Sequence, residues 1–343
     1  MANPCYHASI EGAQHGAKSL PDFLDYAKRA GAAGAQPSNY MLQGGKLFQS
    51  AKAIRDAFDS RGMSLDGISA HCPFWVHTSA WTGTKSGHAF IPPDVQRLSP
   101  EKIEKWAENY LLKLFDLAAE LKIRVLPMFW GVAFGWEIAT GYPWGFWQGP
   151  GYDLIEEGKE RFVKKTAKLR KAANERGIKL CHEIHPGTAA MCAADFHVLV
   201  QICDGDPCLG VNADPSHCWE GESSETRFLS VASRIYAAHV KNHVIRRDFP
   251  VRAMQPDWPK RAMQFTDLAS GDLNMFRYAE MLILAGYPKR YCDIMGTSTA
   301  PLVVEAESAH RDLDATSANG IAFVRDNLCF PVAGGSFEEG MGA

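Results

Sequence analysis

Four ionisable residues in the second half of the chain are spaced so that they could hold a metal ion. They are three carboxylates and one imidazole, each at or near the end of a short apolar run: Glu183, Asp214, His239 and Glu305. Three carboxylates in a low-dielectric pocket repel one another strongly, and a bound dication removes that repulsion. Three oxygen ligands and one nitrogen ligand suit Mn²⁺ first, with Mg²⁺, Co²⁺ or Zn²⁺ as alternatives.

The alternation of side chains along a strand sorts the residues around these four. Glu183 and His185 share one strand face, and His182 lies on the other face. Each of the next three runs also places two polar side chains on one face: Asn212 with Asp214, His239 with Lys241, and Glu305 with Glu307. Any one carboxylate could instead be a helix cap or an ion-pair partner. Four groups of matching parity in consecutive strands favour a metal site.

The elements that must position these residues alternate between short apolar runs and amphipathic stretches. Eight strand–helix pairs predict a single (β/α)8 barrel over residues 1–333, and the Gly-rich, acidic residues 334–343 predict a loose tail. The expected strands are Pro4–Ile10, Ala32–Pro37, Ser64–Cys72, Arg124–Phe129, Lys179–His185, Cys208–Asp214, Ala237–Lys241 and Leu302–Ala306. The expected helices are Leu20–Gly31, Leu47–Arg61, Ser99–Leu121, Leu154–Arg176, Asp195–Cys203, Glu225–Ile235, Leu273–Ala285 and Asp314–Asn327.

Three long connections, Pro73–Leu98, Trp130–Tyr152 and Val244–Leu268, follow strands and therefore lie on the C-terminal face of the predicted barrel. Active sites of such barrels lie on that face. The middle connection is rich in aromatic residues, which could plug the barrel or form a platform for a ring-shaped ligand. Its Trp136 and Trp144 are candidate substrate contacts.

Other residues near the strand ends are candidates for acid–base work or substrate binding. His217 follows Asp214 by three positions and could touch substrate, support the site or cap a helix. His185 and His71 are candidate acid–base residues, and His77 is a weaker one. Lys241 could hold a sugar hydroxyl or an enolate, or it could pair with a carboxylate of the cluster.

Composition excludes several other classes of protein. The net charge of −3 over 343 residues gives no electrostatic footprint for nucleic acid or an anionic membrane. Nine cysteines, with no Cys-x-x-Cys pair, predict free thiols in a reducing compartment rather than disulfides. No signal pattern and no apolar run of membrane-spanning length is present. We therefore expect a soluble cytoplasmic protein.

The chain resembles the sugar isomerase and epimerase superfamily with a xylose-isomerase-like barrel. The resemblance rests on Glu183, Asp214-x-x-His217, His239 and Glu305. It implies that the matching Glu, Asp, His and Glu bind one divalent metal, and that Glu183 and Glu305 also shuttle protons on either side of the substrate. Endonucleases of this superfamily need a basic groove, which the net charge argues against.

Four short segments also resemble those of a bacterial branch of this superfamily that acts on 3-oxo-glycosides. This branch includes the larger subunit of C-glycoside deglycosidases. The segments are His71–His77, Gly141–Gly145, His182–Gly187 and Val304–Ser308. This resemblance implies a carbon–carbon lyase that removes the C2 proton of a 3-oxo-C-glycoside, forms a metal-stabilised enolate and expels the aglycone. It also implies a small second subunit and a hetero-oligomer. A keto-sugar isomerase or epimerase is the alternative, and a barrel subunit without turnover is a further one.

Overall fold

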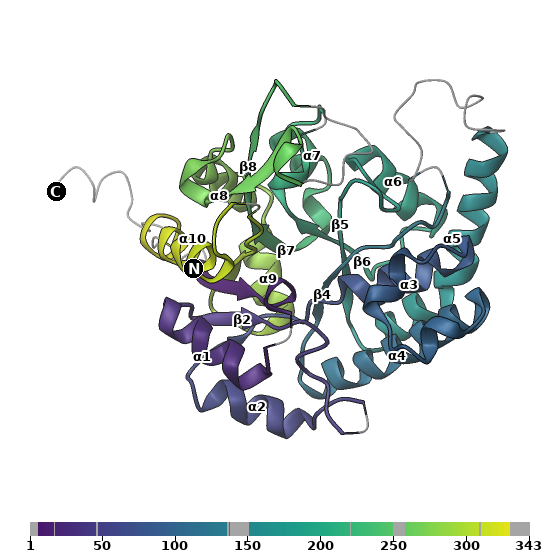
Figure 1. The fold of residues 1–343 in the computed structure, drawn as a ribbon, viewed down its shortest axis with the longest axis horizontal. Helices are drawn as coiled ribbons and strands as arrows, with labels where there is room; N and C mark the ends of the chain where they lie inside the picture. Colours follow the sequence, from purple (N-terminus) through teal and green to yellow (C-terminus); the bar gives the residue numbers. More distant parts are fainter. Residues whose placement is uncertain are drawn as a thin grey trace.

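Eight parallel strands form the central sheet of the protein, in the order β3-β2-β1-β10-β7-β6-β5-β4. The computed structural model describes residues 6–16, 18–45, 47–135, 137, 151–219, 221–249, 258–308 and 310–329. The strands are β1 (Tyr6–Glu11), β2 (Gly34–Gln36), β3 (Ser64–Leu65), β4 (Val125–Met128), β5 (Lys179–Glu183), β6 (Leu209–Ala213), β7 (Ile235–Val240) and β10 (Ala300–Val304). The predicted (β/α)8 barrel is therefore confirmed (Figure 1).

The sheet curls until its two outer strands meet. Beyond the end of β3, the amide of Ala70 donates a hydrogen bond of 2.9 Å to the carbonyl of Pro127 in β4. The pairing register also aligns the strand ends, because Glu183 lies beside Asn212 and Val303 lies beside His239. Side chains from these four strands therefore emerge at one height of the barrel.

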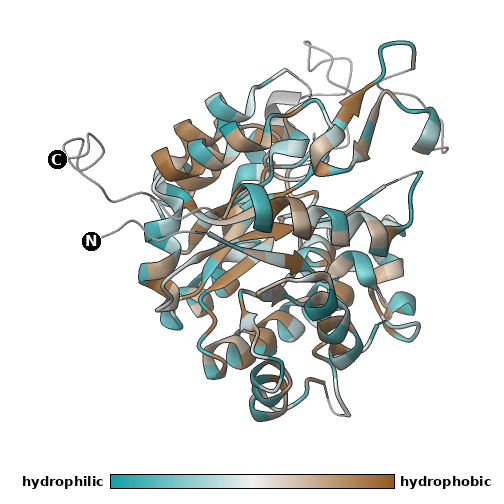
Figure 2. Cartoon of the chain, turned by 90° about the vertical axis from the view of Figure 1, so that its left-hand side faces the viewer, coloured by the Kyte–Doolittle hydropathy of each residue, from teal (hydrophilic) through white to brown (hydrophobic). Residues whose placement is uncertain are grey.

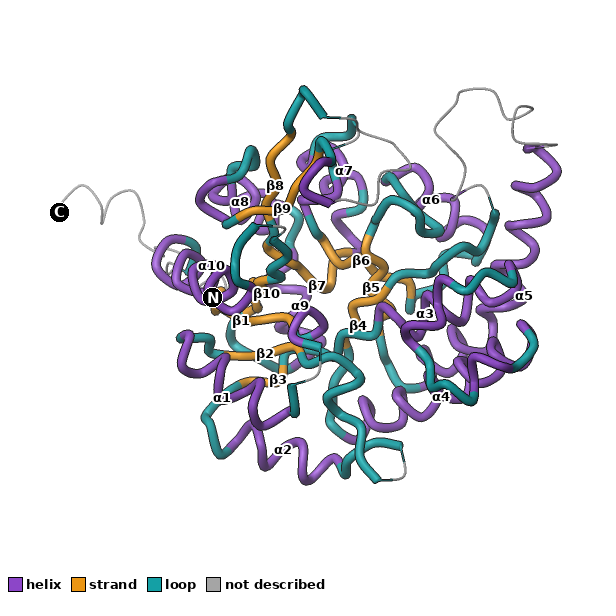
Figure 3. The backbone as a smooth tube through the Cα atoms, in the orientation of Figure 1, coloured by secondary structure: helices purple, strands orange, loops and turns teal. Residues whose placement is uncertain are grey.

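Helices surround the strands, as Figures 1 and 3 show. They are α1 (Leu20–Ala30), α2 (Ala51–Asp59), α3 (His71–Ser79), α4 (Pro100–Glu120), α5 (Gly151–Glu175), α6 (Ala193–Ile202), α7 (Ser224–Ser230), α8 (Met275–Leu284), α9 (Tyr287–Met295) and α10 (Leu313–Asn327). Local sequence sets their ends. For example, α1 begins where the Ser19 hydroxyl accepts a hydrogen bond from the Asp22 amide, and it ends at Gly31, whose φ is 90°.

Several elements differ from the sequence-based expectation. The third strand is only Ser64–Leu65, and His71 begins helix α3 instead of ending that strand. Short apolar runs do not distinguish strand from helix, and Pro73 is tolerated in the first turn of α3. Helix α9 was not predicted, and the long connection after β7 contains a hairpin of β8 (Asn242–Ile245) and β9 (Met263–Thr266). This hairpin projects from the body of the barrel (Figure 2).

Aromatic residues at the start of the predicted aromatic loop belong to the core. Trp130 is fully buried and makes edge-on contacts with Phe74 and Phe162. Phe134 is also buried and stacks on Phe162. Trp136, Trp144 and the tail 334–343 lie outside the described residues. Among the helices that are described, none combines the length and apolar character required to cross a membrane.

Candidate metal centre

The four predicted metal ligands meet at the C-terminal ends of β5, β6, β7 and β10. One donor atom from each of Glu183, Asp214, His239 and Glu305 lies within 4.8 Å of the other three. His239 Nδ1 is 3.0 Å from a Glu305 oxygen and 3.3 Å from Glu183 Oε2. The predicted strand parity therefore holds, and all four side chains point into the barrel mouth.

The negative charges of the three carboxylates are balanced by three basic side chains, Lys241, His217 and His239. Lys241 Nζ lies 3.1 Å from Glu305 and 3.5 Å from Asp214, while His217 Nε2 lies 3.1 Å from Glu183 Oε1. Burial alone would raise the pKa of Glu183, but hydrogen bonds from His217, His239 and His71 more than offset it and hold that pKa well below its usual range. The charge of Lys241 likewise holds the pKa values of Asp214 and Glu305 below their usual range despite burial, so all three carboxylates are ionised at neutral pH.

The carboxylates in turn raise the pKa values of the basic groups beside them. Burial lowers the pKa of His217, but the charge of Asp214 outweighs it and raises that pKa to about 9. The hydrogen bonds of His239 to Glu183 and Glu305 hold its pKa well above the usual range despite burial. Protonated His217, His239 and Lys241 thus supply the positive charge that a dication would also supply.

Features of the cluster fit a divalent ion. Asp214 Oδ2 is buried and accepts no hydrogen bond among the described residues, although His217 Nε2 and Lys241 Nζ lie 3.3 Å and 3.5 Å from it. A buried carboxylate oxygen without a donor is costly, and a cation satisfies it. The donor set of three carboxylates and one imidazole matches the preferences of Mn²⁺ and Mg²⁺.

Neutral side chains outside the cluster make hydrogen bonds to three of the four ligand residues. Asn212 Nδ2 donates to Glu183 Oε2 at 2.7 Å, and Gln14 Nε2 donates to Glu305 Oε1 at 3.1 Å. His239 Nε2 donates to the side-chain oxygen of Gln36 at 2.9 Å. Because Gln36 accepts this proton, Nε2 keeps its hydrogen, and loss of the Nδ1 proton on metal binding would leave the Nδ1 lone pair facing the ion.

Replacing Gln36 by Leu should weaken divalent metal binding by about 10- to 100-fold, since this orienting hydrogen bond is lost. Competitive titration with Mn²⁺ measures the change. Gln43→Leu is the matched control, because Gln43 contacts the Tyr110 hydroxyl instead of a ligand. Equal affinities in the two variants would contradict the role of Gln36.

Two predicted substrate-binding residues, His217 and Lys241, lie directly beside the ligands. His217 is buried, and its ring lies edge-on to Phe265 of the hairpin, with ring centroids 5.8 Å apart. Lys241 Nζ also lies 3.0 Å from Glu307 and 4.4 Å from the centroid of the Phe265 ring. The structure thus shows the ion pairing expected as one alternative for Lys241, and substrate contact stays a prediction for both residues.

The predicted acid–base histidines divide into two groups. His71 Nε2 lies 3.3 Å from Glu183 Oε2, and the His185 ring lies 4.0 Å from the His217 ring, so both border the cluster. His185 Nδ1 donates to the Pro186 carbonyl. His77, in contrast, is buried beside α4 and α5, where it lines a small cavity with Glu104 and Arg161.

His182 faces away from the cluster, as the strand parity predicts. Its Nδ1 accepts a hydrogen bond from the Trp130 amide, and its Nε2 donates to the Ala190 carbonyl. We expect His182→Ala to destabilise the fold by about 2–4 kcal/mol, because it leaves a cavity and unpaired backbone groups. Chemical denaturation and metal analysis test this prediction. A folded variant that has lost its metal would refute it.

The sequence did not indicate three residues of the site: Glu11, Gln14 and Gln36. They lie at or just after the ends of β1 and β2. Asn212 was expected on the same face as Asp214, without an assigned role. Glu11 is buried, and burial together with the charge of Glu305 raises its pKa to about 7. Its carboxylate accepts a hydrogen bond of 2.6 Å from the Ala13 amide and thereby holds the turn that carries Gln14.

Comparison with known proteins agrees with this fold. The model of the family described as xylose isomerase-like TIM barrel matches residues 24–294, and the chain belongs to this family. No curated protein sequence matches the chain.

Three solved structures of similar fold are informative. The probable 3-DHS dehydratase from Bacillus anthracis is 13% identical, with a TM-score of 0.62 over 94% of this chain and 99% of that one. The 3-keto-D-glucoside 4-epimerase from E. coli is 12% identical, with a TM-score of 0.60 and coverages of 94% and 99%. A xylose isomerase-like TIM barrel protein from Mycobacterium smegmatis in complex with magnesium is 15% identical, with a TM-score of 0.57 and coverages of 94% and 97%. None of these comparisons supports the narrower resemblance to C-glycoside deglycosidases.

Proposed function

We propose that the protein is a divalent-metal-dependent enzyme that moves a proton on the carbon beside the carbonyl of a keto-sugar, as isomerases and epimerases do. The observation that carries this proposal is the convergence of Glu183 and Glu305 with Asp214 and His239 at the barrel mouth. Family membership and the epimerase among the structural neighbours support it.

Mn²⁺ is the metal proposed first, and Mg²⁺ is its nearest alternative in view of the magnesium-bound neighbour. Glu183, Asp214, His239 and Glu305 would hold it. A divalent ion in this place supplies Lewis-acid stabilisation of the negative charge that develops on the substrate oxygen when the α-proton leaves.

Two carboxylates of the cluster can accept the proton that leaves the substrate. Glu183 and Glu305 are ionised, because the pKa of Glu183 lies well below its usual range and the pKa of Glu305 falls to about 2, where the charge of Lys241 outweighs burial. Either carboxylate can therefore accept a proton from the substrate. His217 and Lys241 would bind hydroxyl or enolate oxygens. Trp136 and Trp144 stay candidates for contacts with the sugar ring.

A second candidate function is the elimination predicted by the narrower resemblance. Here a base takes the C2 proton of a 3-oxo-glycoside, a C1=C2 double bond forms, and the bond from C1 to the aglycone breaks as the aglycone takes up a proton. The observation that favours it is the pair His71 and His185, which border the cluster without being among its four ligands. His71 could protonate the leaving group, whereas burial and the charge of His217 lower the pKa of His185 to about 3, so His185 would serve as a base. A small second subunit would complete the active enzyme.

One experiment tests both candidates. The protein is incubated in D₂O with Mn²⁺ or with a chelator, and with free keto-sugars or a 3-oxo-C-glucoside, in the presence and absence of a candidate small subunit. NMR should show metal-dependent deuterium incorporation beside the carbonyl and the appearance of an epimer or isomer. Release of free aglycone would favour the lyase. Absence of exchange with every substrate would contradict both.

A further inference from the structure

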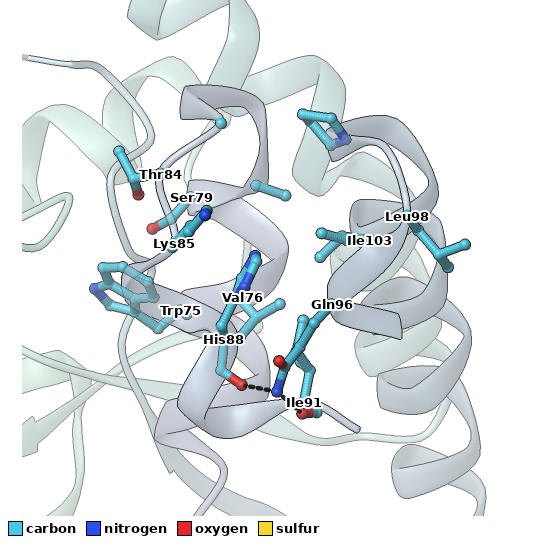
Figure 4. A pocket seen from close by; sticks show the side chains of 14 residues that line it. Trp75, Val76, Ser79, Thr84, Lys85, His88, Ile91, Gln96, Leu98 and Ile103 are labelled. Carbon is cyan, nitrogen blue, oxygen red and sulfur yellow. Dashed lines mark hydrogen bonds between the residues drawn. The ribbon is translucent and has the colours of Figure 1, made fainter. Parts of the chain in front are cut away.

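A second hollow lies beside helix α3 and is lined by none of the four ligand residues (Figure 4). It has a volume of about 220 Å³. Its walls come from the second half of α3, the first turn of α4 and the short 3-10 helix Ser86–Phe90 between them. It therefore belongs to the long connection that follows β3, on the same face of the barrel as the metal centre.

The floor of this α3 cavity is apolar, and one of its sides is formed by a flat aromatic ring. Val76, Ile91 and Ile103 are each no more than 8% exposed, and they belong to a small hydrophobic cluster separate from the barrel core. The Trp75 indole forms one side (Figure 4). A Cβ atom at Gly87 would lie 3.3 Å from both Trp75 and Val76, so the missing side chain keeps this space open.

The rim of the cavity carries basic and no acidic side chains. Lys85 and His88 lie between Trp75 and Ile103 in Figure 4, and no Asp or Glu lines the space. Lys85 makes no ion pair within the described part of the chain. The loop is held in place by Gln96, whose amide donates to the His88 carbonyl at 2.8 Å and to the Ile91 carbonyl at 3.0 Å.

We propose that the α3 cavity binds a small aromatic carboxylate, with its ring against Trp75 and Val76 and its carboxylate on Lys85. An apolar floor beside a cation that has no ion pair among the described residues complements a ligand with a flat apolar body and one negative charge. The size agrees, because an apolar cavity of about 150 Å³ holds benzene, and the additional volume accommodates the carboxylate. This site does not depend on the chemistry proposed for the metal centre.

Binding of benzoate to the full-length protein, measured by ligand-observed NMR and calorimetry, tests this proposal. Benzamide serves as the uncharged isostere, and acetate serves as the carboxylate without a ring. We expect benzoate to bind at least about tenfold more tightly than either, since only benzoate uses both the apolar floor and the cation. No binding of benzoate, or equal binding of all three compounds, would overturn the proposal.

Two substitutions locate the binding. Lys85→Gln and Gly87→Ala should each weaken benzoate binding by about tenfold, through loss of the cation and through narrowing of the cavity. Lys171→Gln on the exposed face of α5 and Gly45→Ala are the matched controls, because a Cβ at Gly45 meets no atom within 4 Å. Unchanged affinity in both cavity variants, with thermal unfolding like that of the controls, would show that benzoate binds elsewhere and refute the assignment.

Discussion

Glu305→Gln should lower turnover by at least about 1000-fold and weaken divalent metal binding by at least about 100-fold. The variant keeps the shape of the side chain but removes one negative ligand and one candidate base. It also removes the charge that faces His239 at 3.0 Å and Lys241 at 3.1 Å. Metal content by mass spectrometry and turnover on the best substrate measure the two effects.

Glu225→Gln is the control for this substitution. Glu225 makes an exposed ion pair with Arg277 on the outside of the barrel, and exposed pairs of this kind contribute little. We expect its turnover and metal affinity to match those of the unmodified protein. If the Glu305→Gln protein keeps its metal and its activity, β10 supplies neither a metal ligand nor a base to the site.

Lys241→Met should destabilise the metal-free protein and have a much smaller effect on the metal-bound protein. Lys241 is 3% exposed and faces Asp214, Glu305 and Glu307, so its removal leaves buried carboxylates without a counter-charge. Breaking a buried pair costs about 3–5 kcal/mol, which in a chain of this length corresponds to a fall in Tm of roughly 4–7 °C. A dication in the cluster restores the missing positive charge.

Calorimetry in chelator and in excess Mn²⁺ tests this difference. Lys171→Met, an exposed residue of α5 paired with Glu175, is the matched control and should change Tm little in either condition. An equal fall in Tm with and without Mn²⁺ would show that Lys241 stabilises the fold by packing alone, and would argue against a cation in the cluster.

The cluster of Glu183, Asp214, His239 and Glu305 could be predicted from the sequence because two regular features of a barrel determine where a strand-end side chain lies. Strand alternation places Glu183, Asp214, His239 and Glu305 inward, and parallel strands end on one face. The same rule would have selected Glu11 at the end of β1 and Gln36 at the end of β2. Gln36 is harder to recognise, because amide residues carry no distinctive chemical signal in a sequence.

The connections could not be predicted in the same way. The run from His71 to His77 is apolar without a clear period, so its folding into α3 depends on packing against α4 and β4. The β8–β9 hairpin places Phe265 over His217 and Lys241, and no local pattern indicates this long-range contact. Trp130 was expected in a loop over the barrel, whereas burial against Phe74 and Phe162 makes it part of the core.

A crystal structure of the protein grown with Mn²⁺, with anomalous diffraction recorded at the manganese edge, tests the central claim most directly. The account predicts one anomalous peak bonded to Glu183, Asp214, His239 and Glu305, with Gln36 still accepting the His239 Nε2 proton. A peak at another place, or no peak at the barrel mouth in crystals saturated with Mn²⁺, would contradict it.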